Sequence, residues 1–193
     1  MTSLTRSTIL ASAMGLIVAG CSSGSTGLPE MPSLREVLPT LQASSLSWRG
    51  DAYLQDVEVQ IPGPPWLTSN VSAVFRSPSE EVQLALVRLD REGVVSTEIL
   101  ETLAPPSPET AITWDDRYLD PMQALDLALN DNERVWLEEN VEEQCGFLQL
   151  RREPRLPAHP VVWRVALMPC PFGDAVLDIT LDAATGEALE QEQ

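Results

Sequence analysis

Apolar and polar residues alternate most strictly in the last third of the chain. Leu177, Ile179 and Leu181 alternate with polar residues, and residues 145–167 contain two further apolar strands separated by a proline-rich turn. Alternation with a period of two is typical of a strand that buries one face. Residues 145–189 are therefore predicted to form three antiparallel strands, the last of which ends in an Asp-Ala-Ala-Thr-Gly turn.

The buried face of the first two strands selects the register of their hairpin, because a slip of one residue would turn every apolar side chain outward. If the turn is centred between Pro157 and Ala158, the apolar residues of the two strands share one face. The opposed pairs are then Leu148–Leu167, Leu150–Val165, Arg152–Trp163 and Cys145–Cys170. Directly opposed positions bring two cysteines within bonding range. The register therefore predicts a disulfide between Cys145 and Cys170.

Apolar residues at helical spacing precede the strands in each half of the chain. The first helix is expected to begin at Ser33, which forms a capping-box pattern with Glu36. Pro39 is expected to kink or shorten this helix. The second helix is expected to begin at Asp120, followed by Pro and with Gln123 in the capping-box position. An Asn-Asp-Asn run is expected to interrupt it.

Each half thus reads as a helix followed by strands. The strand patterns of the first half cover residues 52–61, 71–76, 82–89 and 94–100. A proline-rich linker at 104–113 separates a first helix-plus-sheet unit (33–103) from a second (114–193). The predicted fold class is α+β, with a helix packed on a small antiparallel sheet in two tandem copies.

The charge of the chain excludes several classes of function. There are 12 basic residues, all of them Arg, against 29 acidic ones, and the formal net charge is -17. Such a chain is repelled by nucleic-acid phosphates and by anionic lipid, so nucleic acid is not an expected partner. The apolar fraction of 44% is sufficient for a folded core.

The N-terminal residues predict the location of the protein. Residues 1–20 carry Arg6, an apolar run and no acidic residue, which is the layout of a secretory signal peptide. Leu-Ile-Val-Ala-Gly before Cys21 resembles the lipobox of bacterial lipoproteins, which implies cleavage before Cys21 and acylation of its thiol, as with palmitate. An ordinary signal peptide followed by a chance Cys is the alternative.

The resemblance implies anchoring to the membrane of the bacterial cell envelope. Ser22 resembles the residue that directs lipoproteins to the outer membrane, facing the periplasm. Residues 21–32 are rich in Ser, Gly and Thr and are expected to form a flexible tether.

The remaining cysteines are expected to be structural. If Cys21 is acylated, Cys145 and Cys170 form an even pair in an oxidising compartment. A redox-active pair is the alternative. However, the chain has no Cys-x-x-Cys motif and no Lys that would lower the pKa of a thiol.

No catalytic, cofactor-binding or metal-binding residue is assigned, and an enzyme is not expected. The only histidine, His159, lies in the proline-rich turn, and no Gly-x-Ser-x-Gly accompanies it. Asp115, Asp116 and Asp120 lack the spacing of an EF-hand loop and are assigned to a turn and a helix N-cap. The glutamates at 138, 139, 142 and 143 are assigned to a solvated face, with contact to a basic partner as the alternative.

The last strands resemble a known family. Residues 162–167 (Val-Trp-Arg-Val-Ala-Leu) and 177–189, which contain the Asp-x-x-Thr-Gly turn, are similar to the PepSY domain. The helix of that domain would correspond to residues 121–129, with Ala124 and Ala128 packed on the sheet. The resemblance covers roughly the second unit and implies a PepSY/cystatin-like fold. Residues 73–75 and 86–93 are looser counterparts in the first half.

Members of this family are inhibitory or modulatory modules of envelope and secreted proteins, some of them beside peptidases. The resemblance implies a non-enzymatic interaction module that inhibits or modulates a peptidase or another envelope protein. Such a module can bind extended segments at a sheet edge. A structural or assembly lipoprotein of the outer membrane is the alternative. The sequence specifies neither the partner nor the oligomeric state.

Overall fold

The computed structural model describes residues 30–62, 69–140, 142–171 and 173–189. The predicted signal peptide, Cys21 and most of the predicted tether lie outside these residues. The described elements, in chain order, are α1 (Leu34–Trp48), β1 (Tyr53–Gln60), β2 (Ser69–Ser77), β3 (Glu80–Asp90), β4 (Val95–Glu101), the 3-10 turn η1 (Pro108–Thr110), α2 (Pro121–Ala128), α3 (Asp131–Glu139), β5 (Phe147–Arg152), β6 (Val161–Leu167) and β7 (Leu177–Asp182).

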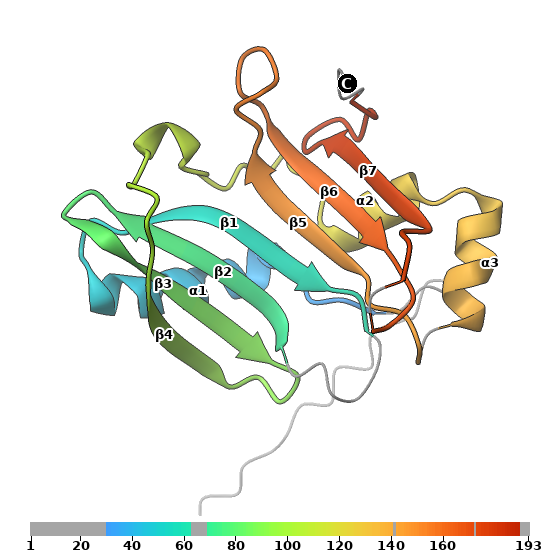
Figure 1. The fold of residues 1–193 in the computed structure, drawn as a ribbon, viewed down its shortest axis with the longest axis horizontal. Coiled ribbons are helices and arrows are strands. Elements are labelled where there is room, and N and C mark those ends of the chain that lie inside the picture. Colours follow the sequence, from blue (N-terminus) through green and yellow to red (C-terminus); the bar gives the residue numbers. More distant parts are fainter. Residues whose placement is uncertain (1–29, 63–68, 141, 172, 190–193) are drawn as a thin grey trace, which may run out of the picture.

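The strands form one antiparallel sheet in the order β4-β3-β2-β1-β5-β6-β7. The α+β class, with helices packed on an antiparallel sheet, is confirmed. Figure 1 shows that the strands before and after η1 meet at β1 and β5 in the middle of this sheet. The described residues give no evidence of two tandem copies with separate sheets.

The core lies between the sheet and the helices α1 and α2, which cover the same face (Figure 1). Val57 and Val59 of the central strand β1 are fully buried in it, and so is Trp163 of β6. Alternate residues of a strand point to the same face. The residues of β1 immediately before, between and after Val57 and Val59 therefore face away from the helices. Trp163 also donates a hydrogen bond of 3.0 Å from Nε1 to the carbonyl of Leu119, which fixes the chain before α2 to the sheet.

The predicted hairpin register was wrong by two residues. In the structure Leu148 is opposite Val165, and Leu150 is opposite Trp163. Glu153 N donates to the carbonyl of Pro160 at the end of the ladder, so the turn is centred one residue earlier than predicted. A shift of two residues leaves each side chain on its original face. The predicted apolar residues are therefore still in the core.

The predicted helices form, with two differences. Helix α1 continues through Pro39 to Trp48, where a kinked or shortened helix was expected. Ser33 is its N-cap, but the Ser33 side chain makes no capping bond, and Leu34 N instead donates to Asp120 Oδ1 at 2.9 Å. The expected interruption separates α2 from α3.

The second predicted helix start is confirmed. Asp120 is the N-cap of α2, and its backbone N donates to Gln123 Oε1 at 2.9 Å. Among the described residues, no helix has both the length and the apolar character needed to cross a membrane.

Candidate functional site: the uncovered face of the sheet

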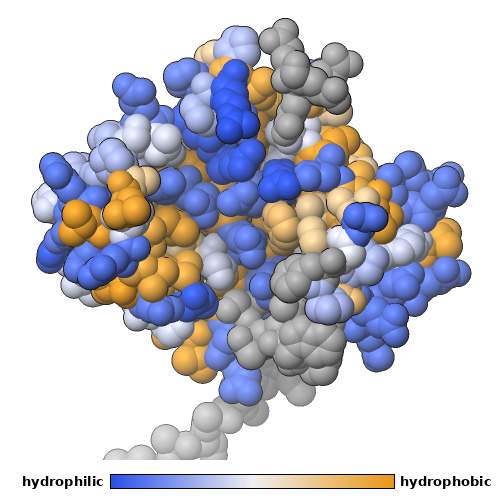
Figure 2. All heavy atoms as spheres, viewed as in Figure 1, coloured by the Kyte–Doolittle hydropathy of each residue, from blue (hydrophilic) through white to orange (hydrophobic). Residues whose placement is uncertain are grey.

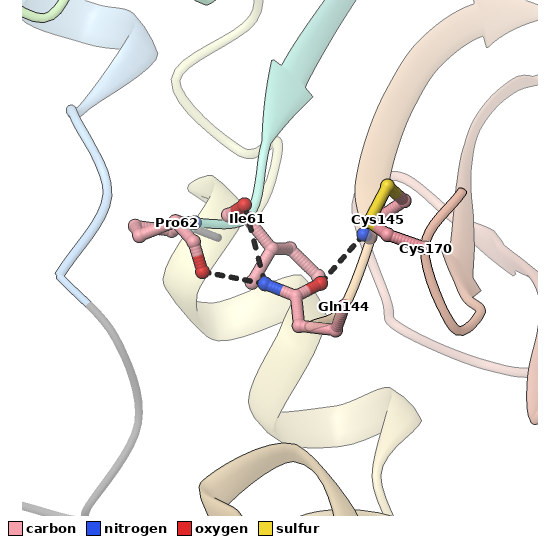
Figure 3. The surroundings of a disulfide bond; sticks show 6 residues. Ile61, Pro62, Gln144, Cys145 and Cys170 are labelled. Carbon is pink, nitrogen blue, oxygen red and sulfur yellow. Dashed lines mark hydrogen bonds between the residues drawn. A yellow bond between two sulfur atoms is a disulfide. The ribbon is translucent and has the colours of Figure 1, made fainter. Parts of the chain in front are cut away.

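The predicted disulfide is present between Cys145 and Cys170, whose Cα atoms are 5.2 Å apart. Beside it lies Gln144, whose side chain is fully buried. Figure 3 shows the Gln144 amide donating to the carbonyls of Ile61 and Pro62, while its oxygen accepts a bond from the backbone of the residue after Cys145. The disulfide and Gln144 thus tie the end of β1 to the start of β5 and to the segment that follows β6.

His159 and the aspartates discussed from the sequence occupy turns and a cap, and the glutamates at 138, 139, 142 and 143 are exposed to solvent. His159 is exposed in the turn between β5 and β6, where its φ is 47°. Asp115 accepts hydrogen bonds from the backbone N and guanidinium of Arg117, at 2.6 to 3.1 Å, which lowers the pKa of Asp115 to about 2. Within the described ranges, no group of three or more His, Cys, Asp and Glu side chains is placed to hold a metal ion.

A shallow cavity of about 580 Å³ lies between the start of α1 and the segment leading into α2. Trp114 and Tyr118 contact each other edge to face in its wall, with ring centroids 5.8 Å apart. Arg35 lies 3.5 Å from a carboxylate oxygen of Asp116. The charged groups that line the cavity are therefore paired with one another and exposed to solvent. This arrangement favours no particular ligand.

The face of the sheet opposite α1 and α2 is a stronger candidate. Among the described elements, no α-helix lies on it, and Figure 1 views the molecule from this side. We call it the uncovered face. The segment after β4 crosses one end of it, where Arg76 donates to the carbonyl of Ala104 at 2.5 Å. Asp56, Glu58 and Gln60 of β1 point toward it, since the residues between them are in the core. On β5 their direct partners are Arg151, Gln149 and Phe147.

Asp56 and Glu58 form a pair of carboxylates at the centre of this face. Burial raises the pKa of Asp56 to about 6; the charge of Glu58 raises it further, whereas Arg151 opposes the shift. Burial also raises the pKa of Glu58. Within the described part of the chain, neither carboxylate accepts a hydrogen bond or lies within ion-pair distance of a cation. The pair is therefore a negative centre without a direct counter-ion, although the nearby charge of Arg151 offsets part of it.

The neighbouring arginines are bound to other carboxylates. Arg164 donates to both carboxylate oxygens of Asp178, at 2.9 and 2.6 Å. Arg151 donates from Nη2 to Glu153 at 2.7 Å, and its Nε is buried without a hydrogen-bond partner in the described structure. The face therefore contains fixed ion pairs around a carboxylate centre that remains available to a cation from outside the chain.

The half of the face formed by β2, β3 and β4 carries several apolar side chains beside the ion pair of Arg88 and Glu98. Figure 2 shows hydrophobic side chains gathered over β3 and β4 and hydrophilic ones along the middle of the face. We define the apolar strip as the side chains on this face that have partial or full exposure, namely Val74, Val82, Leu84, Leu86 and Leu100. The uncovered face thus combines an apolar strip, a feature that often marks a protein-binding surface, with a negative centre.

Sequence reasoning missed Asp56 and Glu58. Their alternation with Val57 and Val59 is visible in the sequence, but it indicates only that they lie on the face away from the core. Their burial depends on the position of β1 at the middle of the sheet, beside β5. Pairing between strands so distant in the chain leaves no local signal.

Comparisons with known proteins found no family, no curated protein and no solved structure that matches the chain. The resemblance to the PepSY domain therefore rests on the residue pattern alone.

Proposed function

We propose that this protein is a non-enzymatic interaction module of the bacterial cell envelope, which binds a partner protein on the uncovered face. The observation that carries the proposal is the carboxylate pair Asp56 and Glu58, which has no direct counter-ion, beside the apolar strip. A partner surface with basic side chains flanked by apolar ones complements both features. The partner would be an envelope protein, such as a peptidase that the module inhibits or modulates.

The proposed location of the module rests on the sequence. The lipobox resemblance supports acylation of Cys21 and an outer-membrane anchor facing the periplasm. The Cys145–Cys170 disulfide is consistent with an oxidising compartment. Mass spectrometry of the mature protein is expected to show an acylated Cys21, and an unmodified thiol there would contradict the anchor.

The family assignment is a proposal of the same kind. A PepSY/cystatin-like origin for the second half is supported by the turn at 182–186 and by the packing of α2 against β6 and β7. In this turn Gly186 N donates to the carbonyl of Asp182 at 2.9 Å, and Gly186 has a φ of 74°. This geometry accounts for the Asp and Gly of the motif in physical terms.

The proposal is tested by photo-crosslinking in intact cells. A photoreactive residue at Gln149, beside Glu58 on the uncovered face, is expected to give a discrete adduct with one envelope protein. The same residue at Glu36, exposed on α1, is the matched control and is expected to give none. Adding Glu58→Gln should reduce the Gln149 adduct, because it removes a charge that the partner neutralises.

The outcome also separates the two candidate functions. An adduct with a peptidase or its propeptide supports the modulatory role, and an adduct with a fixed envelope complex supports the structural or assembly role. Equal adducts from Gln149 and Glu36, or none from Gln149, would refute binding at the uncovered face.

A further inference from the structure

The edge strand β4 presents a row of free backbone groups. Thr102 N donates to Val82 O at 2.8 Å, and Asp90 N donates to Val94 O at 3.0 Å. In an antiparallel pair, alternate residues bond to the neighbouring strand. Even-numbered residues of β4 therefore bond to β3, and the odd-numbered residues between them direct their N–H and C=O groups away from the sheet. These outward groups belong to Val95, Thr97, Ile99 and Glu101.

The outer edge of β4 is open. Figure 1 shows β4 at the margin of the sheet, and no described residue pairs with its outer side. The opposite margin is different. There Asp182 N donates to Glu187 O and Leu189 N donates to Thr180 O, both at 2.8 Å, so the chain after β7 covers part of that edge.

Strand β4 lacks several of the devices that protect an edge strand, although Glu98 and Glu101 disfavour pairing with another acidic strand. It contains no Pro and no Lys, and its pairing with β3 is regular from Gln83↔Glu101 to Leu89↔Val95, without a bulge. Natural proteins commonly use such features to prevent unwanted pairing of an edge strand. A regular, exposed seven-residue edge is therefore a template for an added strand.

The side chains of β4 indicate what kind of segment fits. Glu98 and Leu100 lie on the uncovered face, whereas Ile99 and Glu101 lie on the helix side. Ile99 keeps 41% of its surface exposed. Side chains directly opposed across two strands contact each other, and opposite charges there are favourable. Glu98 accepts a bond of 2.7 Å from Arg88 on one carboxylate oxygen, but its side chain remains 53% exposed. Basic residues would therefore face Glu98 and Glu101, and apolar residues would face Ile99 and Leu100.

A second copy of this chain is a poor occupant of the edge. Each copy carries a formal net charge of -17 and has no lysine, so two copies repel each other. A basic segment of another protein has the complementary charge.

We propose that β4 binds an extended segment of a partner protein as an added strand, and that this segment carries a basic–apolar–apolar–basic pattern opposite Glu98, Ile99, Leu100 and Glu101. The pattern is the same in both chain directions, so it fits parallel and antiparallel addition alike. The inference rests on the proposed role as an interaction module, and it names the chemistry of the partner.

The test uses the full chain, purified in detergent, and a synthetic peptide with a central Arg-Val-Val-Arg sequence. Amide hydrogen exchange is measured by NMR with and without the peptide. The peptide is expected to slow exchange at the outward amides of Thr97, Ile99 and Glu101. Exchange at Ser96 and Leu100, whose amides already bond to β3, should change little. A scrambled Arg-Arg-Val-Val peptide of equal charge is the control and should give no such alternation.

Two changes to the complex probe the backbone contacts. Thr97→Pro removes an outward N–H without removing a bond to β3 and should abolish binding. Because a proline can also destabilise the strand, a peptide N-methylated at alternate residues provides a second probe that leaves the protein unchanged. The affinity of this peptide should fall at least tenfold.

The side-chain charges are tested separately. Removal of both charges by Glu98→Gln together with Glu101→Gln should weaken binding of the peptide about tenfold.

Failure of this inference is distinguishable from failure of the proposed function. Equal protection by the Arg-Val-Val-Arg and scrambled peptides, or protection that does not alternate along β4, would refute strand addition while leaving the Gln149 crosslink intact. Alternating protection without a Gln149 crosslink would support the edge and refute the uncovered face as a docking surface.

Discussion

Replacing Asp56 by Asn is expected to stabilise the protein at neutral and alkaline pH. Burial raises the pKa of Asp56 from an ordinary value of 3.8 to about 6, so the folded protein holds this proton more tightly than the unfolded chain does. The contribution of this proton to the free energy of unfolding is fully present below the pKa of Asp56 in the unfolded chain. It is lost as the pH rises through about 6, the pKa of Asp56 in the folded protein. The difference between the two pKa values corresponds to about 3 kcal/mol. Asn has the same shape as Asp and carries no charge, so it avoids this loss.

The assay is urea unfolding of the wild-type protein and the Asp56→Asn variant at pH 8 and at pH 4. The variant should be more stable by about 3 kcal/mol at pH 8, and the difference should fall below about 1 kcal/mol at pH 4.

Asp178→Asn is the matched control. The hydrogen bonds from Arg164 lower the pKa of Asp178, so its contribution is present above the unfolded pKa and lost as the pH falls. This variant should therefore be destabilised at pH 8, and less so at low pH. A stability difference for Asp56→Asn that does not change with pH, or that destabilises the fold at pH 8, would refute the assignment of Asp56 as a buried charge without a partner.

Three further substitutions test the scaffold. Replacing Cys145 and Cys170 by Ala opens a cross-link with a sequence separation of 25 and should lower the free energy of unfolding by about 3 kcal/mol in urea titrations; reduction of the wild-type protein should have the same effect. Gly186→Ala places a Cβ 2.5 Å from a leucine side chain at a φ of 74° and should lower the free energy of unfolding by about 1–3 kcal/mol, whereas Gly50→Ala, with open space around it, should change it little. Trp163→Phe removes a buried hydrogen bond and part of a core ring and should cost about 1–3 kcal/mol in the same titration, and an unchanged midpoint would contradict its role as a core anchor.

The disulfide was predictable from the sequence even though the register was not. Cys145 N donates to Met168 O at 2.9 Å, so Cys145 and Cys170 are offset rather than directly opposed as predicted. Because the slip is two residues, the cysteines remain on the same side of the hairpin and within bonding range. The length and shape of the proline-rich turn set the exact pairing. Ala158 and His159 adopt left-handed conformations there, which the apolar pattern does not reveal.

Helix α1 shows where a local rule was outweighed by packing. Pro39 removes a hydrogen bond within the helix, which favours a kink or an end. Leu38 and Leu41, on either side of it, have 7% and 0% of their surface exposed in the core. Burial of such side chains stabilises a helix by more than this single bond costs. The sequence pattern shows the apolar residues but not the sheet that covers them, so it does not reveal that packing outweighs the effect of Pro39.

The negative centre and the open edge lie in one cross-strand row, which limits how a single partner can reach both. Asp56 is paired with Val74, Val74 with Leu86, and Leu86 with Glu98. Three strand spacings separate the ends of this row, a distance of about 14 Å. A strand added beside β4 lies one spacing beyond Glu98, too far for its own side chains to reach Asp56. A partner that uses both surfaces must therefore pair an extended segment with β4 and place a second element, bearing a basic residue, across the apolar strip. Loss of the charge at Glu58 should then lower the affinity for the whole partner protein but leave the affinity for the isolated peptide unchanged.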